Sequence, residues 1–170
     1  MKRHFFFFRH GDRAGIEPES GISELGVCQA HRLGRFLSDK GIEIVYSSPL
    51  RRSIDTARIA LNNPNLEIIT DERLIETAFG FWYDENHPDQ QRIINNFNRI
   101  KSCFDYIVAN DTHNSVAIAS HGGVTRALCW CCGYKVDRDI NTAHCFHFVL
   151  DDGKWQFIEE FKPEIEDVNE

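Results

Sequence analysis

Short, continuously apolar runs alternate along the chain with longer segments in which apolar residues recur at helical spacing. The first run, residues 4–8, ends abruptly at Arg9, which is typical of a strand buried on both faces of a parallel sheet. The next segment begins a helical pattern at Ser23 and ends it at Gly41, a residue type that favours helix ends. Further strands are expected at residues 42–46, 66–69 and 116–119, and further helices at residues 48–61, 90–108 and 122–133.

The last part of the chain departs from this alternation. Residues 144–150 and 155–161 both have strand character, and the Asp-Asp-Gly tripeptide at 151–153 favours a hairpin turn between them. Residues 79–88 are aromatic and polar without a period and are expected to form a loop. The whole pattern predicts a three-layer α/β/α sandwich with a mainly parallel central sheet and an antiparallel strand near the C-terminus. No linker or repeat interrupts it, so residues 1–170 are expected to form one domain.

Composition and charge narrow the class of protein. The chain has 26 acidic and 19 basic residues and a formal net charge of −7 at pH 7. Nucleic-acid binding needs many Lys and Arg residues on one face, so no nucleic-acid partner is expected. The apolar run near the N-terminus is too short for a signal peptide, and no run could span a membrane, so we expect a cytoplasmic protein without a membrane partner. The acidic residues 159–170 are expected to form a solvated tail, and nothing in the sequence indicates the oligomeric state.

Six cysteines are present, and three of them lie close together at Cys129, Cys131 and Cys132. Their spacing matches no common zinc pattern, although a metal site is the alternative that it leaves open. Free cysteine is among the most buried residue types, so we expect these three to be buried, reduced thiols on a helix. No disulfide framework is predicted.

Polar and glycine residues follow three of the predicted strands at their carboxyl ends. In chain order they are Arg9, His10 and Gly11; Ser47, Ser48, Arg51 and Arg52; and Ser120, His121, Gly122 and Gly123. Glu76 lies a few residues beyond the strand predicted at 66–69. In open α/β sheets, ligands bind beyond the carboxyl ends of the strands, so these residues are expected to converge on one rim.

The residue types at this rim suit phosphoryl transfer. Guanidinium groups match phosphate oxygens, and a neutral imidazole is a competent nucleophile. Glycines let the backbone approach an anion, and a carboxylate can protonate a leaving oxygen and then deprotonate water. Taken singly, His10, Arg52, Glu76 and His121 each have an ordinary structural or solvated interpretation; their combination at three strand ends favours a site. The other histidines are interpreted as structural or exposed: His4, His31, His87, His113, His144 and His147.

Five segments, in order, resemble the motifs of the histidine phosphatase superfamily, also called the phosphoglycerate mutase-like family. They are RHG at 9–11, GISELGVCQAHRLGRFL at 21–37, YSSPLRRSIDTA at 46–57, LIETAFGFW at 74–82 and SHGGVTRAL at 120–128. RHG alone is weak, but five ordered motifs from the N-terminus to about residue 130 are specific. SHGG also resembles the phosphatase branch more than the mutase branch.

The resemblance implies a role for each matching residue. His10 would attack phosphorus and become phosphorylated, and Glu76 would act as acid to the leaving group and then as base to water. Arg9, Arg52 and His121 would hold the phosphoryl oxygens, with Arg51 as a less favoured substitute for Arg52. Three further substrate-binding residues are expected, namely Gly11, Ser48 and Gly122. No metal and no cofactor are implied.

The function expected from the resemblance is that of a metal-independent phosphatase acting on phosphomonoesters. Its partner would be a small phosphorylated metabolite or a phosphorylated protein side chain. Asp12 replaces the Glu or Gln that often follows the first motif, and the Asn and Trp features of cofactor-dependent mutases are missing. Little chain lies between Glu76 and His121 to build a lid, whereas a mutase must shield its phosphoenzyme from water.

Two other functions stay open. One is a cofactor-dependent phosphoglycerate mutase, and the other is a phosphate-ligand binding protein without turnover. Substrate specificity is expected to lie in residues 15–20 and 79–89, with Trp82, Tyr83 and Arg126 as candidate contacts.

Overall fold

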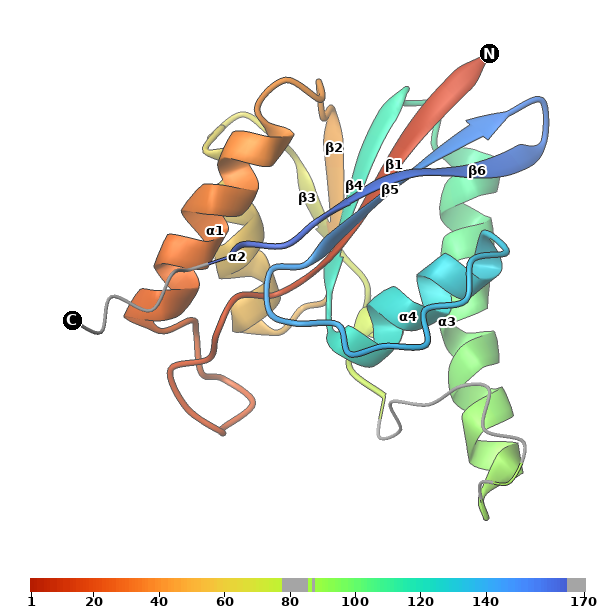
Figure 1. Cartoon of the computed structure of the whole chain (residues 1–170), viewed down its shortest axis with the longest axis horizontal. Coiled ribbons are helices and arrows are strands. Elements are labelled where there is room, and N and C mark those ends of the chain that lie inside the picture. The colour runs from red at the N-terminus through yellow and green to blue at the C-terminus, as the bar shows by residue number, and fades with distance from the viewer. Residues whose placement is uncertain (78–85, 87, 165–170) are drawn as a thin grey trace.

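The computed structural model describes residues 1–77, 86 and 88–164 of the chain. Strands and helices alternate through most of it (Figure 1). The strands are β1 Lys2–Arg9, β2 Ile44–Ser47, β3 Ile68–Thr70, β4 Ser115–Ser120, β5 Cys145–Asp151 and β6 Lys154–Phe161. The helices are α1 Glu24–Leu37, α2 Arg51–Leu61, α3 Gln90–Asn110 and α4 Gly122–Cys131, with a short 3₁₀ turn at Glu72–Leu74.

The strands form one sheet in the order β3-β2-β4-β1-β5-β6. Pairing is parallel from β3 through β1 and antiparallel where β5 joins β1 and β6 joins β5. Helices α1 and α2 cover one face of the sheet and α3 and α4 cover the other (Figure 1). The sequence-based prediction of a mainly parallel α/β sandwich with antiparallel character near the C-terminus is therefore confirmed.

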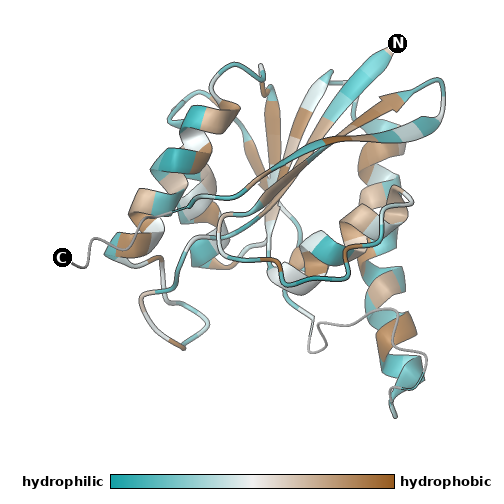
Figure 2. Ribbon diagram, viewed as in Figure 1, coloured by the Kyte–Doolittle hydropathy of each residue, from teal (hydrophilic) through white to brown (hydrophobic). Residues whose placement is uncertain are grey.

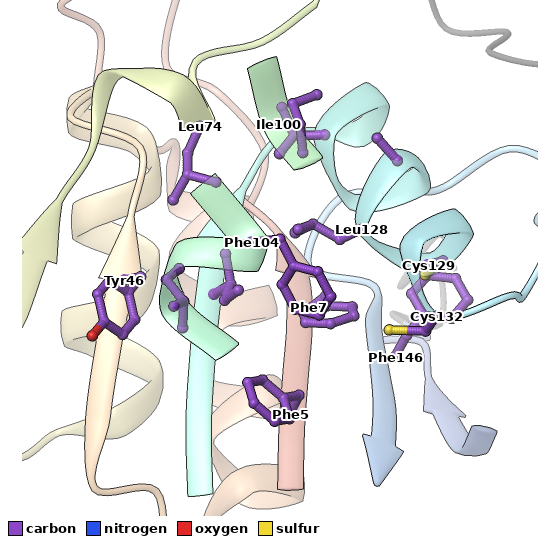
Figure 3. Close-up of a cluster of buried hydrophobic side chains, with 14 of the residues drawn as sticks. Phe5, Phe7, Tyr46, Leu74, Ile100, Phe104, Leu128, Cys129, Cys132 and Phe146 are labelled. Atoms are coloured by element: carbon purple, nitrogen blue, oxygen red, sulfur yellow. The ribbon is translucent and has the colours of Figure 1, made fainter. Parts of the chain in front are cut away.

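Strand β1 explains why its sequence is continuously apolar. Phe5 and Phe7 pack into the core between the sheet and helices α3 and α4, while Phe6 and Phe8 pack toward α1 and α2. All four are at most 1% exposed. Figure 3 shows Phe5 and Phe7 among the side chains of the first of these cores, and Figure 2 shows the apolar residues concentrated along the strands. Burial of one such ring contributes roughly 1.5–3 kcal/mol, so β1 anchors both layers.

Helix α2 begins at Arg51, three residues later than the sequence pattern predicted. Pro49 disfavours helical conformation at the residue before it, which is Ser48. Leu50, the residue after Pro49, is the N-cap of α2 and is extended, with φ of −69° and ψ of 136°. Ser48 lies between the end of β2 and the start of α2, and its Oγ accepts from the Leu50 N–H at 3.3 Å.

The prediction of a solvated acidic tail from residue 159 was wrong for its first residues. Glu159 and Glu160 belong to β6, and each has a basic partner from a distant part of the chain. Lys40 Nζ lies 3.0 Å from Glu159 Oε1, and Arg138 forms an ion pair with Glu160. Residues 165–170 lie outside the described residues.

The six cysteines are free thiols. Cys129 and Cys132 are buried as predicted, whereas Cys131 is only partly buried. Burial raises the pKa of the Cys131 thiol to about 12. The loop predicted at 79–88 lies almost entirely outside the described residues. Among the helices that the structure describes, none combines the length and apolarity needed to cross a bilayer.

Candidate active site

The register of the sheet brings the predicted strand ends together. In the β1–β4 pair, Arg9 lies opposite Ser120, and the next residue, His10, donates its backbone N–H to the Ser120 carbonyl at 2.9 Å. The rings of His10 and His121 consequently lie side by side, with centroids 5.2 Å apart. On the other side of β4, the Ser48 N–H donates to the Ala119 carbonyl at 2.9 Å. Three segments distant in sequence therefore meet at one edge.

His10 has a fixed tautomer. Its Nδ1 lies 2.6 Å from the carbonyl oxygen of Gly11, and a carbonyl can only accept, so Nδ1 carries the proton. Nε2 then presents a lone pair, which accepts from Arg52 Nε at 3.3 Å. Burial lowers the pKa of His10 to about 4, and the charges of Arg9 and Arg52 act in the same direction against the Gly11 hydrogen bond. The ring is therefore neutral at pH 7.

Arg52 is held in place by a residue that the sequence analysis missed. Thr56 lies one helical turn after Arg52, and its Oγ1 donates to the Arg52 carbonyl at 2.7 Å. The same oxygen accepts from the Gly11 N–H at 2.9 Å, which ties α2 to the loop that carries His10. The four-residue spacing on α2 was the available signal, because it places both residues on one helix face. Arg51 points elsewhere: its Nε lies 3.3 Å from Asp55 at the helix surface.

His121 is completely buried and is held by Ser48, whose Oγ lies 2.8 Å from His121 Nε2. Burial, together with His10 and Arg52, lowers the pKa of His121 to about 2. Its Nδ1 and the Nε of Arg9 are buried atoms without a hydrogen-bond partner among the described residues. Buried polar atoms are normally paired, so these two nitrogens indicate where a ligand could supply oxygen atoms.

Glu76 faces the same edge from the segment after β3. Its Oε1 accepts from the backbone N–H of Thr77 at 2.8 Å and of Gly123 at 3.2 Å. Although water reaches this side chain, many protein atoms surround its carboxyl group, and this loss of solvent raises the pKa of Glu76. The Arg9 and Arg52 charges oppose that shift. Arg9 itself donates Nη1 to the Ile140 carbonyl at 2.7 Å.

The two glycines predicted to bind substrate lie in different surroundings. A Cβ on Gly11 would come 2.8 Å from the carbonyl oxygen of Gly26, so Gly11 allows its loop to contact helix α1. A Cβ on Gly122 would make only ordinary contacts with the Arg9 side chain, the nearest at 3.6 Å. Gly122 thus lies beside the Arg9 guanidinium at the start of α4, where backbone N–H groups favour an anion. Substrate binding by Gly11, Ser48 and Gly122 stays a prediction.

A pocket of about 340 Å³ opens beside these residues. Its lining consists of Arg9, Glu76, Gly122, Gly123, Arg126, Asp139, Ile140 and Asn141. A larger hollow of about 640 Å³ lies elsewhere, over the C-terminal ends of α1 and α2, so volume alone does not locate the site. Within the described part of the chain, no three His, Cys, Asp or Glu side chains are grouped to hold a metal ion.

Comparison with known proteins identifies the family of the chain. The model of the histidine phosphatase superfamily (branch 1) matches residues 5–160, and the chain belongs to this superfamily. Phosphoserine phosphatase 1 of Hydrogenobacter thermophilus is 28% identical over 145 residues, which cover 72% of this chain and 67% of the relative.

Two solved structures share the fold at lower identity. A phosphoglycerate mutase from Bacillus anthracis aligns with a TM-score of 0.75 at 21% identity, covering 92% of each chain. A mycobacterial glucosyl-3-phosphoglycerate phosphatase aligns with a TM-score of 0.70 at 20% identity, covering 92% of this chain and 97% of that one. At these identities the two structures show a shared fold with this chain.

Proposed function

We propose that the protein is a metal-independent phosphatase that hydrolyses phosphomonoesters through a phosphohistidine on His10. The observation that carries this proposal is the state of the His10 ring. The imidazole is neutral, its Nδ1 proton is fixed on the Gly11 carbonyl, and its Nε2 lone pair faces the guanidinium of Arg52, a group that suits phosphoryl oxygens. Phosphatase relatives support hydrolysis as the reaction class.

In the first step, the His10 Nε2 lone pair forms a bond to phosphorus while the bond from phosphorus to the ester oxygen breaks. The leaving oxygen takes a proton from Glu76, whose raised pKa favours the protonated form needed for that donation. Arg9 and Arg52 offset the charge on the phosphoryl oxygens, and His121 contacts one of them through Nδ1, a buried nitrogen without a partner among the described residues.

In the second step, Glu76, now a carboxylate, removes a proton from water. The resulting oxygen attacks phosphorus, the phosphorus–nitrogen bond breaks, and His10 regains its lone pair. The products are an alcohol and inorganic phosphate. No step requires a metal ion, because the guanidinium groups supply the positive charge that a metal would otherwise provide.

The test measures phosphate release with chelator present, together with trapping of the intermediate. The purified protein is incubated with 4-nitrophenyl phosphate and with phosphoserine, the latter because one relative carries that name. Rapid quenching should capture an acid-labile, base-stable phosphoryl group on His10, and the variant His10→Ala should show neither turnover nor trapping. Full activity in His10→Ala, or loss of activity with chelator, would contradict the proposal.

The same experiment separates the two alternatives. A phosphoglycerate mutase would isomerise 3-phosphoglycerate with little net release of phosphate. A binding protein without turnover would bind phosphate esters and give no trapped phosphohistidine. Hydrolysis with phosphate as the main product would rule against both.

A further inference from the structure

The pocket beside the site continues from Glu76 and not from His10. Glu76 and Arg9 line the pocket. Its described lining does not include His10, Arg52 or His121. Under the proposed function, on which this inference rests, Glu76 protonates the leaving oxygen, so the leaving group must lie on the Glu76 side of phosphorus. The pocket therefore lies where the alcohol part of the substrate has to go.

The far wall of the pocket is formed by the loop between α4 and β5, and this loop is firmly held. Arg126 is 5% exposed and donates Nη1 to the Val136 carbonyl at 3.0 Å and Nη2 to the Arg138 carbonyl at 2.9 Å. Arg9 Nη1 donates to the Ile140 carbonyl at 2.7 Å. Three charge-assisted hydrogen bonds thus fix the backbone on both sides of Asp139, and two of the donors come from a helix that begins at the site.

The charges on the pocket wall define what it can take. Both guanidinium groups direct Nη donors to backbone carbonyls, whereas Asp139 and Asn141 are exposed. Burial lowers the pKa of the Arg9 guanidinium, and the nearby Asp139 carboxylate is one of the negative charges that oppose this shift. When Arg9 pairs with a bound phosphoryl group, the Asp139 carboxylate is left free to interact with the leaving alcohol.

We propose that Asp139 and Asn141 form a specificity subsite for leaving groups that carry a hydrogen-bond donor, an ammonium or a hydroxyl group. A carboxylate accepts from such groups, and a hydrogen bond to a charged partner is stronger than a neutral one. A leaving group with its own carboxylate meets repulsion at Asp139, and an apolar one leaves the carboxylate without a new partner. The pocket of about 340 Å³ has room for a small alcohol.

The test compares four esters of similar size: phosphoethanolamine, 2-hydroxyethyl phosphate, ethyl phosphate and phosphoglycolate. In the unmodified protein, kcat/KM should fall in that order, with the ammonium ester favoured over the carboxylate ester at least about tenfold. Asp139→Asn keeps the shape of the side chain and should reduce this preference about tenfold. The matched control is Asp137→Asn, an exposed acid on the same loop that does not line the pocket, and it should keep the preference.

Equal kcat/KM for all four esters, or a preference that Asp139→Asn leaves unchanged, would overturn the subsite while leaving the phosphatase intact. A second measurement is independent of turnover: the dissociation constants of phosphoethanolamine and phosphoglycolate are determined on His10→Ala by calorimetry. The ammonium ester should bind more tightly, and Asp139→Asn in the same background should remove the difference. Failure of both esters to bind, or equal binding, would overturn the subsite even if no turnover were found.

Discussion

Burial of His10 in its neutral form should make the protein less stable at acidic pH, and the variant His10→Gln should remove that part of the acid sensitivity. The pKa of folded His10 is about 4, whereas an unfolded histidine has a pKa near 6.5. At pH 5 the unfolded state is thus almost fully protonated at this position and the folded state is only about one-tenth protonated. Because the folded pKa is depressed, stability is present above the unfolded pKa and decreases as pH falls from about 6.5 toward 4.

The magnitude follows from the interval between pH 6.5 and pH 5. Within this interval, each pH unit lowers the free energy of unfolding by about 1.4 kcal/mol. His10 therefore lowers it by about 2 kcal/mol on going from pH 7 to pH 5. Glutamine does not titrate, so His10→Gln should lose about 2 kcal/mol less than the unmodified protein over the same interval. Taking the difference between the two pH values cancels any fixed cost of the substitution and the contribution of His121, which is present in both proteins.

Urea unfolding at pH 7 and pH 5 measures this difference from the midpoints, provided that the slopes agree. His31→Gln is the matched control, since His31 is exposed on α1 and water reaches its ring in both the folded and unfolded states. That control should show the full acid loss of the unmodified protein. If His10→Gln also loses as much stability as the unmodified protein, the burial argument for a neutral His10 is refuted.

Three further outcomes follow from the site. Arg52→Lys should lower kcat/KM about 100-fold, because a lysine cannot replace a positioned guanidinium. The control Arg51→Lys should keep kcat/KM near the unmodified value. Steady-state kinetics on 4-nitrophenyl phosphate measures both, and equal values for the two variants would contradict the role of Arg52. Thr56→Val should lower the free energy of unfolding by about 1–3 kcal/mol, measured in urea, because the Gly11 N–H loses its partner, and an unchanged midpoint would contradict this. Glu76→Gln should slow the hydrolysis of alkyl esters by about 10²–10⁴-fold. It should also abolish the fall of kcat/KM at high pH, so that the pH profile keeps only the decrease near pH 4 that comes from His10. A profile that still falls at high pH would refute the role of Glu76 as acid.

The fold and the candidate site differ in how far the sequence could predict them. The layers followed from β1, whose run of phenylalanines has no polar face, and from the regular alternation of strands and helices. The meeting of His10 with His121 was predictable because parallel strands end at the same edge of a sheet. The hydrogen bonds that hold these side chains in place could not be predicted from the sequence. Thr56 lay within a recognised motif, but its double hydrogen bond depends on how closely α2 approaches the loop after β1.

The remaining differences come from contacts between residues far apart in sequence. Glu159 and Glu160 were predicted to belong to a solvated acidic tail. Their ion-pair partners, Lys40 and Arg138, lie elsewhere in the sequence, so the pairing could not be predicted from the local pattern. Asp139 gave no signal at all, since it lies in a loop without periodicity. Its position depends on the donors of Arg126, a residue that the sequence analysis considered only as a possible substrate contact.

The contact between Gly11 and Gly26 limits how this enzyme could be redesigned. A methyl group on Gly11 would come 2.8 Å from the Gly26 carbonyl, and one on Gly26 would come 2.3 Å from the Asp12 carbonyl. Each collision is with main-chain atoms, which cannot rotate out of the way as a side chain can. Mutant libraries built to change substrate choice should therefore leave both positions untouched and concentrate diversity on Asp139 and Asn141, whose side chains are exposed to water.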